Sequence, residues 1–405
     1  MRFGDELFMR AAQYAALKVS RLPCWTVDVS PFNSEIRGRS QDGNEHYFYS
    51  SVATSHGVAQ LGELMGVRHL LSTVEQQSAQ DNLPKRSGMP AAEKKRLPRG
   101  AYTVALICPL EIEFSAARYM LDEEHERLPR KDGDTNLYTL GVLSGHNTVL
   151  ASLPEGSQGT ATAATVANNL SRSFPDIKLR LLVGIGGGVP SEKNDIHLGD
   201  VVVSVPKGTS GGVVEYDLGK QTTTVFERKG FLCPIPSKWR NIVTNMKSDH
   251  RTKQNRITEF RLEMLRKYPM LTEYERPSRE SDILFPATYK HVVEGATCAD
   301  CNKDTAITRK QREEPDHPKI FYGLIASGNS VIKDAEKRDR LAHDADGAIC
   351  FEMEAAGLMN DFQCIVIRGI ADYCDSHKND GWHGYAAAAA AGLAKEILLL
   401  EVSSQ

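Results

Sequence analysis

The pattern of apolar and polar residues changes near residue 100. Beyond that point, short apolar runs alternate with segments in which apolar residues recur every three or four positions. The short runs are typical of buried strands and the periodic segments are typical of helices. We expect strands at 102–110, 179–189, 198–206, 321–329 and 364–373, and a hairpin over 138–153. We expect helices at 111–124, 159–174, 236–272 and 385–402, and a strand leading into a helix at 348–362.

This alternation of strands and helices predicts an α/β fold. Such patterns favour a three-layer arrangement, in which a mixed, mostly parallel twisted sheet is flanked by helices. In such sheets, binding sites form where strand ends meet loops. The predicted domain covers residues 101–402.

The first hundred residues have a different character. Residues 1–83 predict a helix at 3–17, strands at 25–29 and 46–53, and a helical pattern beginning at Gly57, but they carry no chemical motif. Residues 84–99 hold six Lys or Arg, one Glu and three Pro. A segment with so little apolar surface predicts a linker, over 84–100. A localisation signal or a polyanion-binding patch is the alternative interpretation.

Composition restricts the classes of function. The 405 residues carry a formal net charge of −3, which argues against a globally basic nucleic-acid binder. The eight cysteines predict buried free thiols in a reducing compartment rather than a disulfide scaffold. There is no signal-peptide pattern and no apolar run near the roughly 20 residues that span a bilayer. We therefore expect a cytoplasmic protein without a membrane partner, with the nucleus as the alternative compartment.

Glycines follow one predicted strand, at Gly184-Ile-Gly-Gly-Gly188. Glycines allow backbone N–H groups to approach a ligand closely. The spacing is not the dinucleotide-binding pattern, because position 189 is valine. A tight turn packed against a neighbouring element explains the same glycines equally well.

Acidic residues follow three predicted strands. Glu113 follows the first strand, Glu352 and Glu354 lie two apart on a strand-like entry to a helix, and Asp372 ends the last strand. Residues two apart on a strand share a face, and a carboxylate accepts well from vicinal hydroxyls. Each acid alone could be a helix N-terminal or turn residue. Their joint placement at three strand ends predicts one shared acidic site.

Six motifs occur in the order found in the nucleoside phosphorylase/nucleosidase family. They are CPLEIE at 108–113, VGIGGGVP at 183–190, LGDVVVS at 198–204, ASGN at 326–329, FEMEAAG at 351–357 and GIADYCD at 369–375. Residues from about 101 to 402 therefore resemble this family of purine and uridine phosphorylase-like proteins. The phrases FEMEAAGLMNDF and DSHKNDGWHGYAAAAAA resemble its fungal branch, in which the domain often precedes a nucleotide-binding oligomerisation domain and repeats.

The resemblance implies cleavage of the N-glycosidic bond of a purine nucleoside or nucleotide. It implies that Asp372 protonates N7 of the leaving base, that Glu354 binds the 2′- and 3′-hydroxyls, and that Glu113 holds an attacking water. Met353 would pack beneath the ribose. The other implied substrate contacts are Gly184, Gly186, Gly187, Phe351, Glu352, Ser327, Gly328, Asn329 and Thr160.

Two departures from the family pattern affect the prediction. Where hydrolytic bacterial relatives stack an aromatic residue on the base, this chain has Val331, so Phe226 or Phe231 becomes the stacking candidate. The phosphate-loop segment 155–160 carries hydroxyls but no arginine, and Glu155 would repel phosphate. With Glu113, this favours water over phosphate as the nucleophile.

Relatives in immune-type proteins resemble nucleosidases that act on nucleotides including ATP, whose phosphates would need cations. The candidates are Lys207, Arg228, Lys229, Lys333, Arg338 and Lys378.

A separate metal-ligand pattern lies in the polar segment near residues 281–318. Cys298 and Cys301 are spaced as CxxC, and His291 precedes them by seven residues. These three are a candidate structural zinc site, although a structural site usually has four ligands. The family chemistry implies no required cofactor, and a phosphorylase would take phosphate as co-substrate.

Three functional hypotheses follow. The first is a purine nucleosidase, with a phosphate-dependent purine nucleoside phosphorylase as its alternative. The second is a nucleotide-sensing module that no longer catalyses. The third, a nucleic-acid-associated factor, is disfavoured by the acidic net charge, so we expect a small-molecule partner and no nucleic acid. The resemblance also implies a homo-oligomer. The length predicts a free-standing enzyme or a truncated member of the fungal branch.

Overall fold

The computed structural model describes residues 26–29, 35–39, 45–49, 94–224, 226–293 and 296–401. The chain divides into two units, Met1–Ala92 and Glu93–Gln405, which we describe separately.

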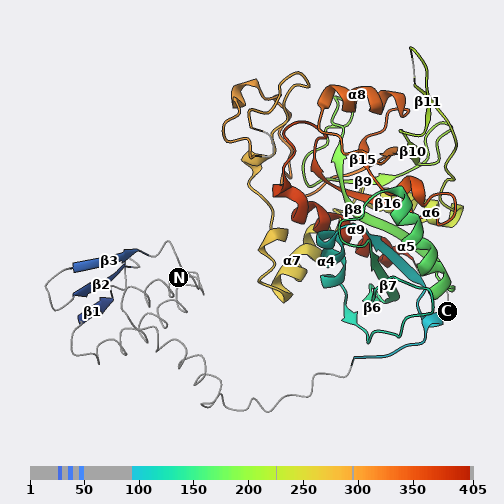
Figure 1. The fold of residues 1–405 in the computed structure, drawn as a ribbon, viewed down its shortest axis with the longest axis horizontal. Helices are drawn as coiled ribbons and strands as arrows, with labels where there is room; N and C mark the ends of the chain where they lie inside the picture. The colour runs from blue at the N-terminus through green and yellow to red at the C-terminus, as the bar shows by residue number, and fades with distance from the viewer. Residues whose placement is uncertain are drawn as a thin grey trace. The chain divides into compact units, whose positions relative to one another are not determined.

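The described part of the first unit is a small antiparallel sheet (Figure 1). Its strands are β1 (Thr26–Val29), β2 (Glu35–Arg39) and β3 (Glu45–Tyr49), in that order. The predicted strands at 25–29 and 46–53 overlap β1 and β3, and β2 was not predicted. The helices predicted at 3–17 and from Gly57 lie outside the described residues.

The second unit is built on a mixed sheet of eleven strands within its described residues. At its centre, β4 (Val104–Cys108) runs parallel to both β7 (His146–Ser152) and β8 (Leu179–Gly188), and β8 runs parallel to β16 (Ile365–Asp372). The burial of every residue of β4 and β16 explains why these strands read as continuous apolar runs. The remaining strands are β5 (Glu123–Glu124), β6 (Tyr138–Leu143), β9 (Val201–Ser204), β10 (Val213–Glu215), β13 (Ile320–Gly323), β14 (Ile325–Ser327) and β15 (Cys350–Glu352). A separate hairpin joins β11 (Gly219–Gln221) and β12 (Phe226–Arg228).

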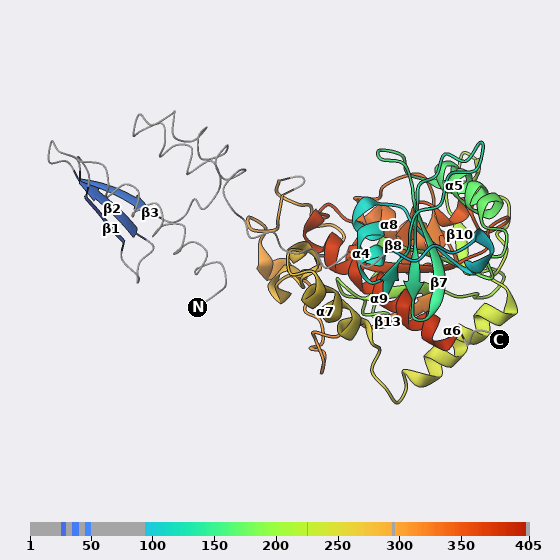
Figure 2. The ribbon, with the colours of Figure 1, turned by 90° about the horizontal axis from the view of Figure 1, so that it is seen from below.

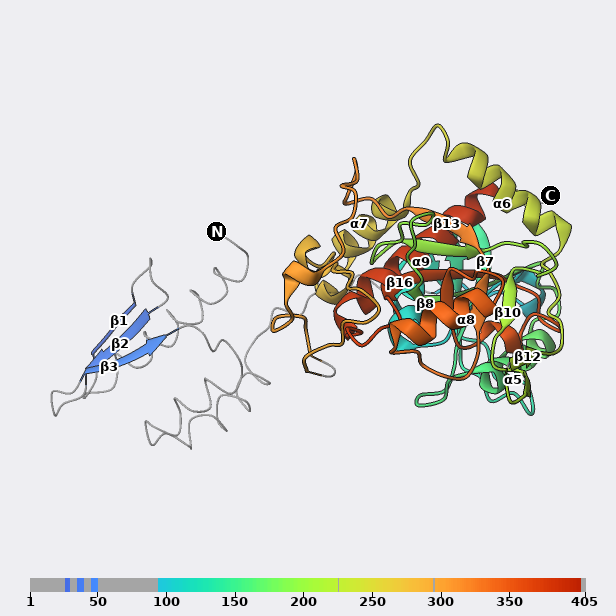
Figure 3. The same ribbon diagram turned by 90° about the horizontal axis from the view of Figure 1, so that it is seen from above.

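Helices cover both faces of this sheet (Figures 2 and 3). The views place α6 (Ser237–Asp249), α7 (Ile257–Lys267) and α9 (His383–Leu400) on one side of the central strands. They place α5 (Thr160–Ser173) and α8 (Ala335–Asp344) on the other side. α4 (Glu111–Tyr119) packs against α9. The predicted three-layer α/β fold with a mixed sheet is confirmed.

The closing helix α9 is the central buried element of one layer. It is apolar all round and packs on β8 and β16, which is why its sequence is rich in alanine. A Cβ atom on Gly369 of β16 would lie 1.9 Å from the backbone oxygen of Ala386. The glycine therefore allows strand and helix to approach closely.

Three local features differ from the predictions. The single helix expected at 236–272 is two helices, α6 and α7, separated by residues 250–256. The helix expected within 348–362 is only a short 3₁₀ turn, η5 (Ala355–Gly357), and α8 was not predicted. The expected hairpin is present, and its turn at Ser144 and Gly145 has positive φ at both residues. Among the described helices, none is long and apolar enough to cross a membrane.

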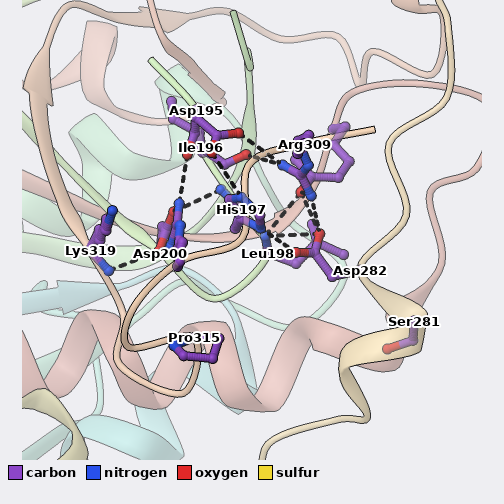
Figure 4. A network of polar contacts seen from close by, with 12 residues as sticks. Asp195, Ile196, His197, Leu198, Asp200, Ser281, Asp282, Arg309, Pro315 and Lys319 are labelled. Atoms are coloured by element: carbon purple, nitrogen blue, oxygen red, sulfur yellow. Dashed lines mark hydrogen bonds and ion pairs between the residues drawn. The ribbon is translucent and has the colours of Figure 1, made fainter. Parts of the chain in front are cut away.

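A long connection, residues 275–318, leads from the 3₁₀ turn η2 (Thr272–Tyr274) to β13; we call it the 275–318 segment. Two short turns interrupt it, η3 (Arg279–Ser281) and η4 (Lys303–Thr305). A polar network fastens it to the sheet (Figure 4).

In this network, Asp282 accepts hydrogen bonds from Arg309 at 2.9 Å and from the hydroxyl of Tyr373 at 2.5 Å. Arg312 donates to both oxygens of Asp200, at 2.7 and 2.6 Å. Because Tyr373 directly follows β16, the 275–318 segment is fixed against the loop that leaves that strand.

Candidate active site

The predicted acidic residues line one cavity of about 240 Å³. It lies where the carboxyl ends of β4 and β16 meet the glycines of β8 and the end of β15. Its lining comprises Pro109, Leu110, Glu113, Gln158, Ile185, Gly186, Gly187, Ser330, Val331, Ile332, Phe351, Glu352, Met353, Glu354, Arg368, Asp372, Cys374, Lys378 and His383. Three strand ends, those of β4, β15 and β16, therefore deliver four carboxylates to one cavity.

Arg368 connects three of the four carboxylates. It lies in the middle of β16, is 1% exposed, and pairs through Nη2 with Glu352 and, at 3.2 Å, with Glu354. Its Nη1 lies 3.8 Å from Oε1 of Glu113. Burial alone would lower the pKa of the guanidinium, but the surrounding carboxylates raise it above its ordinary value. The buried positive charge thus makes the acidic cluster tolerable in a dry site.

Gly184 provides the space for this cluster. A Cβ atom at this position would lie 2.4 Å from both Arg368 Nη1 and Glu113 Oε1. Any side chain would therefore push the guanidinium and the carboxylate out of place. Gly184 does not itself line the cavity, so its role is to leave room for Arg368 and Glu113, which do.

Glu113 occupies the first turn of α4 and is 2% exposed. Its Oε2 accepts the backbone N–H of Leu110 at 2.7 Å, and its Oε1 accepts that of Ile185 at 2.7 Å. Burial raises the pKa of Glu113 to about 7, against the opposing effects of Arg368 and the two backbone N–H groups. At neutral pH the side chain is divided between acid and base, which suits proton transfer.

Glu352 and Glu354 differ in how many hydrogen bonds their carboxylates already accept. Glu352 accepts from the backbone N–H groups of Glu354 and Ala355 at 3.1 to 3.2 Å as well as from Arg368, so both of its oxygens are occupied. Glu354 accepts only one hydrogen bond on each oxygen, from the backbone N–H of Gly159 and from Nη2 of Arg368, both at 3.2 Å, and burial raises its pKa. Glu354 is thus the better placed of the two to accept ligand hydroxyls.

Asp372 ends β16 and is 5% exposed. Its Oδ1 accepts the backbone N–H of Cys374 at 2.8 Å, and its Oδ2 pairs with Nζ of Lys378 at 2.7 Å. Burial alone would lower the pKa of the Lys378 ammonium, but the neighbouring Asp372 raises that pKa above its ordinary value. The loop 373–378 thus brings a cation to the carboxylate.

The other predicted substrate contacts lie in two groups. Gly186, Gly187, Phe351 and Met353 line the cavity. Ser327, Gly328, Asn329 and Thr160 do not, and their polar atoms bond within the chain. Ser327 Oγ accepts the backbone N–H of Ala356 at 2.9 Å, and Asn329 Oδ1 accepts from both the N–H and the hydroxyl of Thr160. These residues hydrogen-bond within the chain rather than line the cavity.

The aromatic residue in the cavity is Phe351, whose ring meets Tyr216 edge to face at a centroid distance of 5.4 Å. Neither Phe226 nor Phe231, the stacking candidates from the sequence, lines this cavity; Phe231 is 80% exposed. Val331 does line it.

Of the candidate cations for a phosphate chain, only Lys378 lines the cavity. Arg338 is buried against the backbone oxygen of Tyr373, and Arg228 pairs with Asp346.

Arg368, Gln158 and His383 were missed as site residues. An arginine inside the apolar run 364–373 was a usable signal, because a fully buried arginine is rare unless it is paired. Gln158 and His383 lie in a loop and at a helix start, where the sequence gives no signal for their orientation. Burial lowers the pKa of His383, so its imidazole is neutral near pH 7.

The chain was compared with known proteins. No family model matches it. A nucleotide-binding leucine-rich repeat (NLR)-like protein of Hyaloscypha variabilis is 43% identical over 318 residues, which are 78% of this chain and 31% of that protein. The chain thus spans about a third of the length of this relative.

Two nucleosidases are also similar in sequence. The 5′-methylthioadenosine/S-adenosylhomocysteine nucleosidase of Mycobacterium tuberculosis is 24% identical over 311 residues, covering 74% of this chain and 97% of that enzyme. The ATP nucleosidase Cap17 of Escherichia coli is 35% identical over 84 residues, covering 20% of this chain and 17% of that protein. Among solved structures, a Helicobacter pylori 5′-methylthioadenosine/S-adenosylhomocysteine nucleosidase matches with a TM-score of 0.47 and 14% identity, covering 74% of this chain and 98% of that one. The sequence similarities confirm that the chain is related to the nucleoside phosphorylase/nucleosidase superfamily.

Proposed function

We propose that this chain is a nucleosidase, which cleaves the N-glycosidic bond of purine nucleosides or nucleotides with water as the nucleophile. The observation that carries the proposal is one cavity lined by Glu113, Glu354 and Asp372, which come from three different strand ends. The similarity to nucleosidases supports the same class of reaction.

Glu113 is suited to activate the water. Both of its oxygens are fixed by backbone N–H groups, so the carboxylate has one orientation. With a pKa of about 7, it can accept a proton from water as the water oxygen attacks C1′ of the sugar. That attack forms the new C–O bond while the bond to the base breaks.

Glu354 is suited to bind the sugar. In the transition state the sugar resembles an oxocarbenium ion, and negative charge nearby stabilises it. Glu354 keeps accepting capacity toward the cavity and would bind the 2′- and 3′-hydroxyls, while Met353 would pack against the ring. Arg368 holds Glu352 and Glu354 in place behind the sugar.

Asp372 and Lys378 are suited to the leaving base. The electron pair of the broken C–N bond goes to the purine, which needs a proton at N7. The Asp372–Lys378 pair holds a proton that can pass to N7 through the Asp372 carboxylate. Glu113 gains one proton and the pair loses one, so the cycle closes when both exchange with solvent.

The substrate and the setting of the reaction belong to the same proposal. Lys378 can also meet a 5′-phosphate, so nucleotides including ATP stand beside nucleosides as substrates. The reaction would serve nucleoside metabolism or immune-type signalling in a homo-oligomer. The residues proposed to act on the sugar, the water and the base are all side chains, so the mechanism requires no cofactor.

Product analysis tests the proposal. The full chain would be incubated with adenosine, AMP, ATP, inosine and guanosine, each with and without inorganic phosphate, and the products separated by chromatography. We expect free base at a rate that does not depend on phosphate. Ribose 1-phosphate formed only with phosphate would replace the hydrolase with a phosphorylase. Tight binding with no turnover would indicate a sensing module instead.

A further inference from the structure

A second chemical site lies in the 275–318 segment, apart from the acidic cavity. The structure brings His291, Cys298 and Cys301 together, with one donor atom from each within 4.8 Å of the others. None of the three lines the acidic cavity. We propose that these residues bind a structural Zn²⁺ ion.

The donor set fits zinc. Two thiolates and an imidazole are soft to borderline ligands, and tetrahedral sites built from them are typical of structural zinc. Both cysteines are free thiols in the structure, and Cys301 is 6% exposed. The three donor atoms therefore lie within reach of one ion.

Unsatisfied histidine nitrogens beside the cluster support the assignment. Nε2 of His291 is buried without a hydrogen-bond partner. Coordination through Nε2 would place the ring proton on Nδ1, so the 3.1 Å contact of Nδ1 with the backbone N–H of Val293 would open when the ion binds. The ring of His377 meets that of His291 edge to face at 5.0 Å, and both of its nitrogens are also buried without hydrogen-bond partners, although Nδ1 lies 3.7 Å from Oδ1 of Asp375. Buried polar atoms without partners are costly, and metal coordination satisfies them. The cluster supplies three protein ligands, and a water molecule would complete a four-coordinate site.

The metal would brace the loop that carries the leaving-group residues. The backbone N–H of His291 donates to Ser376 Oγ at 2.9 Å. His377 stacks on Phe285 and Tyr289, at centroid distances of 4.2 and 5.7 Å. Ser376 and His377 directly precede Lys378, so the ion would fix the packing partner of the Asp372–Lys378 loop. In this sense it is a positioning element, not a catalytic one.

Metal analysis of the purified full chain tests the proposal. After dialysis against Zn²⁺ and then against metal-free buffer, we expect about one zinc ion per chain. Cys298→Ser and His291→Ala should each lose most of it. Cys233→Ser and His343→Ala are the matched controls, because neither residue belongs to the cluster, and both should retain the ion. Co²⁺ in place of Zn²⁺ should give the intense absorption of tetrahedral thiolate coordination.

The outcomes are decisive without an activity assay. If the wild-type chain, folded by circular dichroism, keeps no stoichiometric zinc, the proposal is wrong. It is equally wrong if the Cys233→Ser control loses as much metal as Cys298→Ser. Because a cluster variant could lose zinc by unfolding, chelation of the wild type provides a second measurement. Removal of the ion should lower the Tm of the wild-type chain, by roughly 2–4 °C for each kcal/mol of unfolding free energy lost, and should expose the 275–318 segment to protease. Re-addition of Zn²⁺ should reverse both effects.

Discussion

At the scale of single residues, the site depends on one buried cation. Arg368 offsets three carboxylates that could not otherwise share a dry cavity. The three carboxylates are chemically similar but differ in their hydrogen bonding and pKa. Glu352 accepts four hydrogen bonds, Glu354 accepts two and keeps more capacity for ligand, and Glu113 has a pKa raised to about 7. The environment of each carboxylate, rather than its residue type, separates a structural acid from a base.

Replacement of Glu113 tests its proposed role as the base. Glu113→Gln keeps the shape but cannot take a proton from water, so kcat should fall by about 10²–10⁴-fold with little change in KM. Glu111→Gln is the matched control, because Glu111 is exposed in the same helical turn and, among the described residues, accepts a hydrogen bond from Ser115 alone. In the wild type, steady-state rates should fall as pH drops through about 7. Equal losses in both variants would argue against a catalytic Glu113.

The same carboxyl group should also affect stability. Its pKa is about 7 when folded against an ordinary 4.5, so the folded chain binds the extra proton more tightly between these values. The free energy of unfolding should therefore decrease as pH rises from about 4.5 to about 7, by up to about 3 kcal/mol. Glu113→Gln should lack this decrease. Urea unfolding of both proteins at pH 5 and pH 7.5 measures it, and parallel profiles would contradict the raised pKa.

At the scale of elements, the buried strands were predictable from the sequence, whereas the helices and the side-chain pairs at the site were only partly predictable. β4, β8 and β16 are buried on both faces, so each reads as an apolar run in the sequence. α8 was missed because its buried face includes Arg338 between two alanines, which leaves almost no apolar periodicity. The sequence predicted that the four acidic residues lie together because each belongs to the end of a strand and those ends converge. The Asp372–Lys378 pair was not, because it depends on the path of a loop whose packing involves the distant 275–318 segment.

The contact between β16 and α9 supplies a prediction at this scale. Gly369→Ala would place a methyl group 1.9 Å from a backbone oxygen, and backbone cannot give way cheaply. We expect a loss of about 1–3 kcal/mol in unfolding free energy, together with lower activity, because β16 carries both Arg368 and Asp372. Gly381→Ala is the control, since its Cβ would meet only a side-chain oxygen at 3.0 Å. Thermal unfolding of both variants gives the comparison, and equal Tm values would refute this account of the packing.

At the scale of the whole molecule, the described groups of the acidic cavity all belong to the second unit. Every residue that lines the acidic cavity, and every described strand of the large sheet, belongs to residues 93–405. The basic run at 84–99 adds positive charge next to the division between the units, while the formal net charge of the whole chain is −3. The first unit therefore contributes no described group to the proposed reaction.

A truncation follows from this separation and tests it. A chain comprising residues 93–405 retains the whole large sheet, α9 and the four cavity carboxylates, so it should fold with the same Tm transition as the second unit of the full chain. Its kcat/KM for the substrate identified by product analysis should lie within about twofold of the full-chain value, since no described part of the cavity is lost. Size-exclusion chromatography with light scattering on both chains would show whether residues 1–92 affect assembly. A folded truncation with its zinc but without activity would mean that the first unit takes part in the site. In that case the cavity carboxylates alone would not suffice for catalysis.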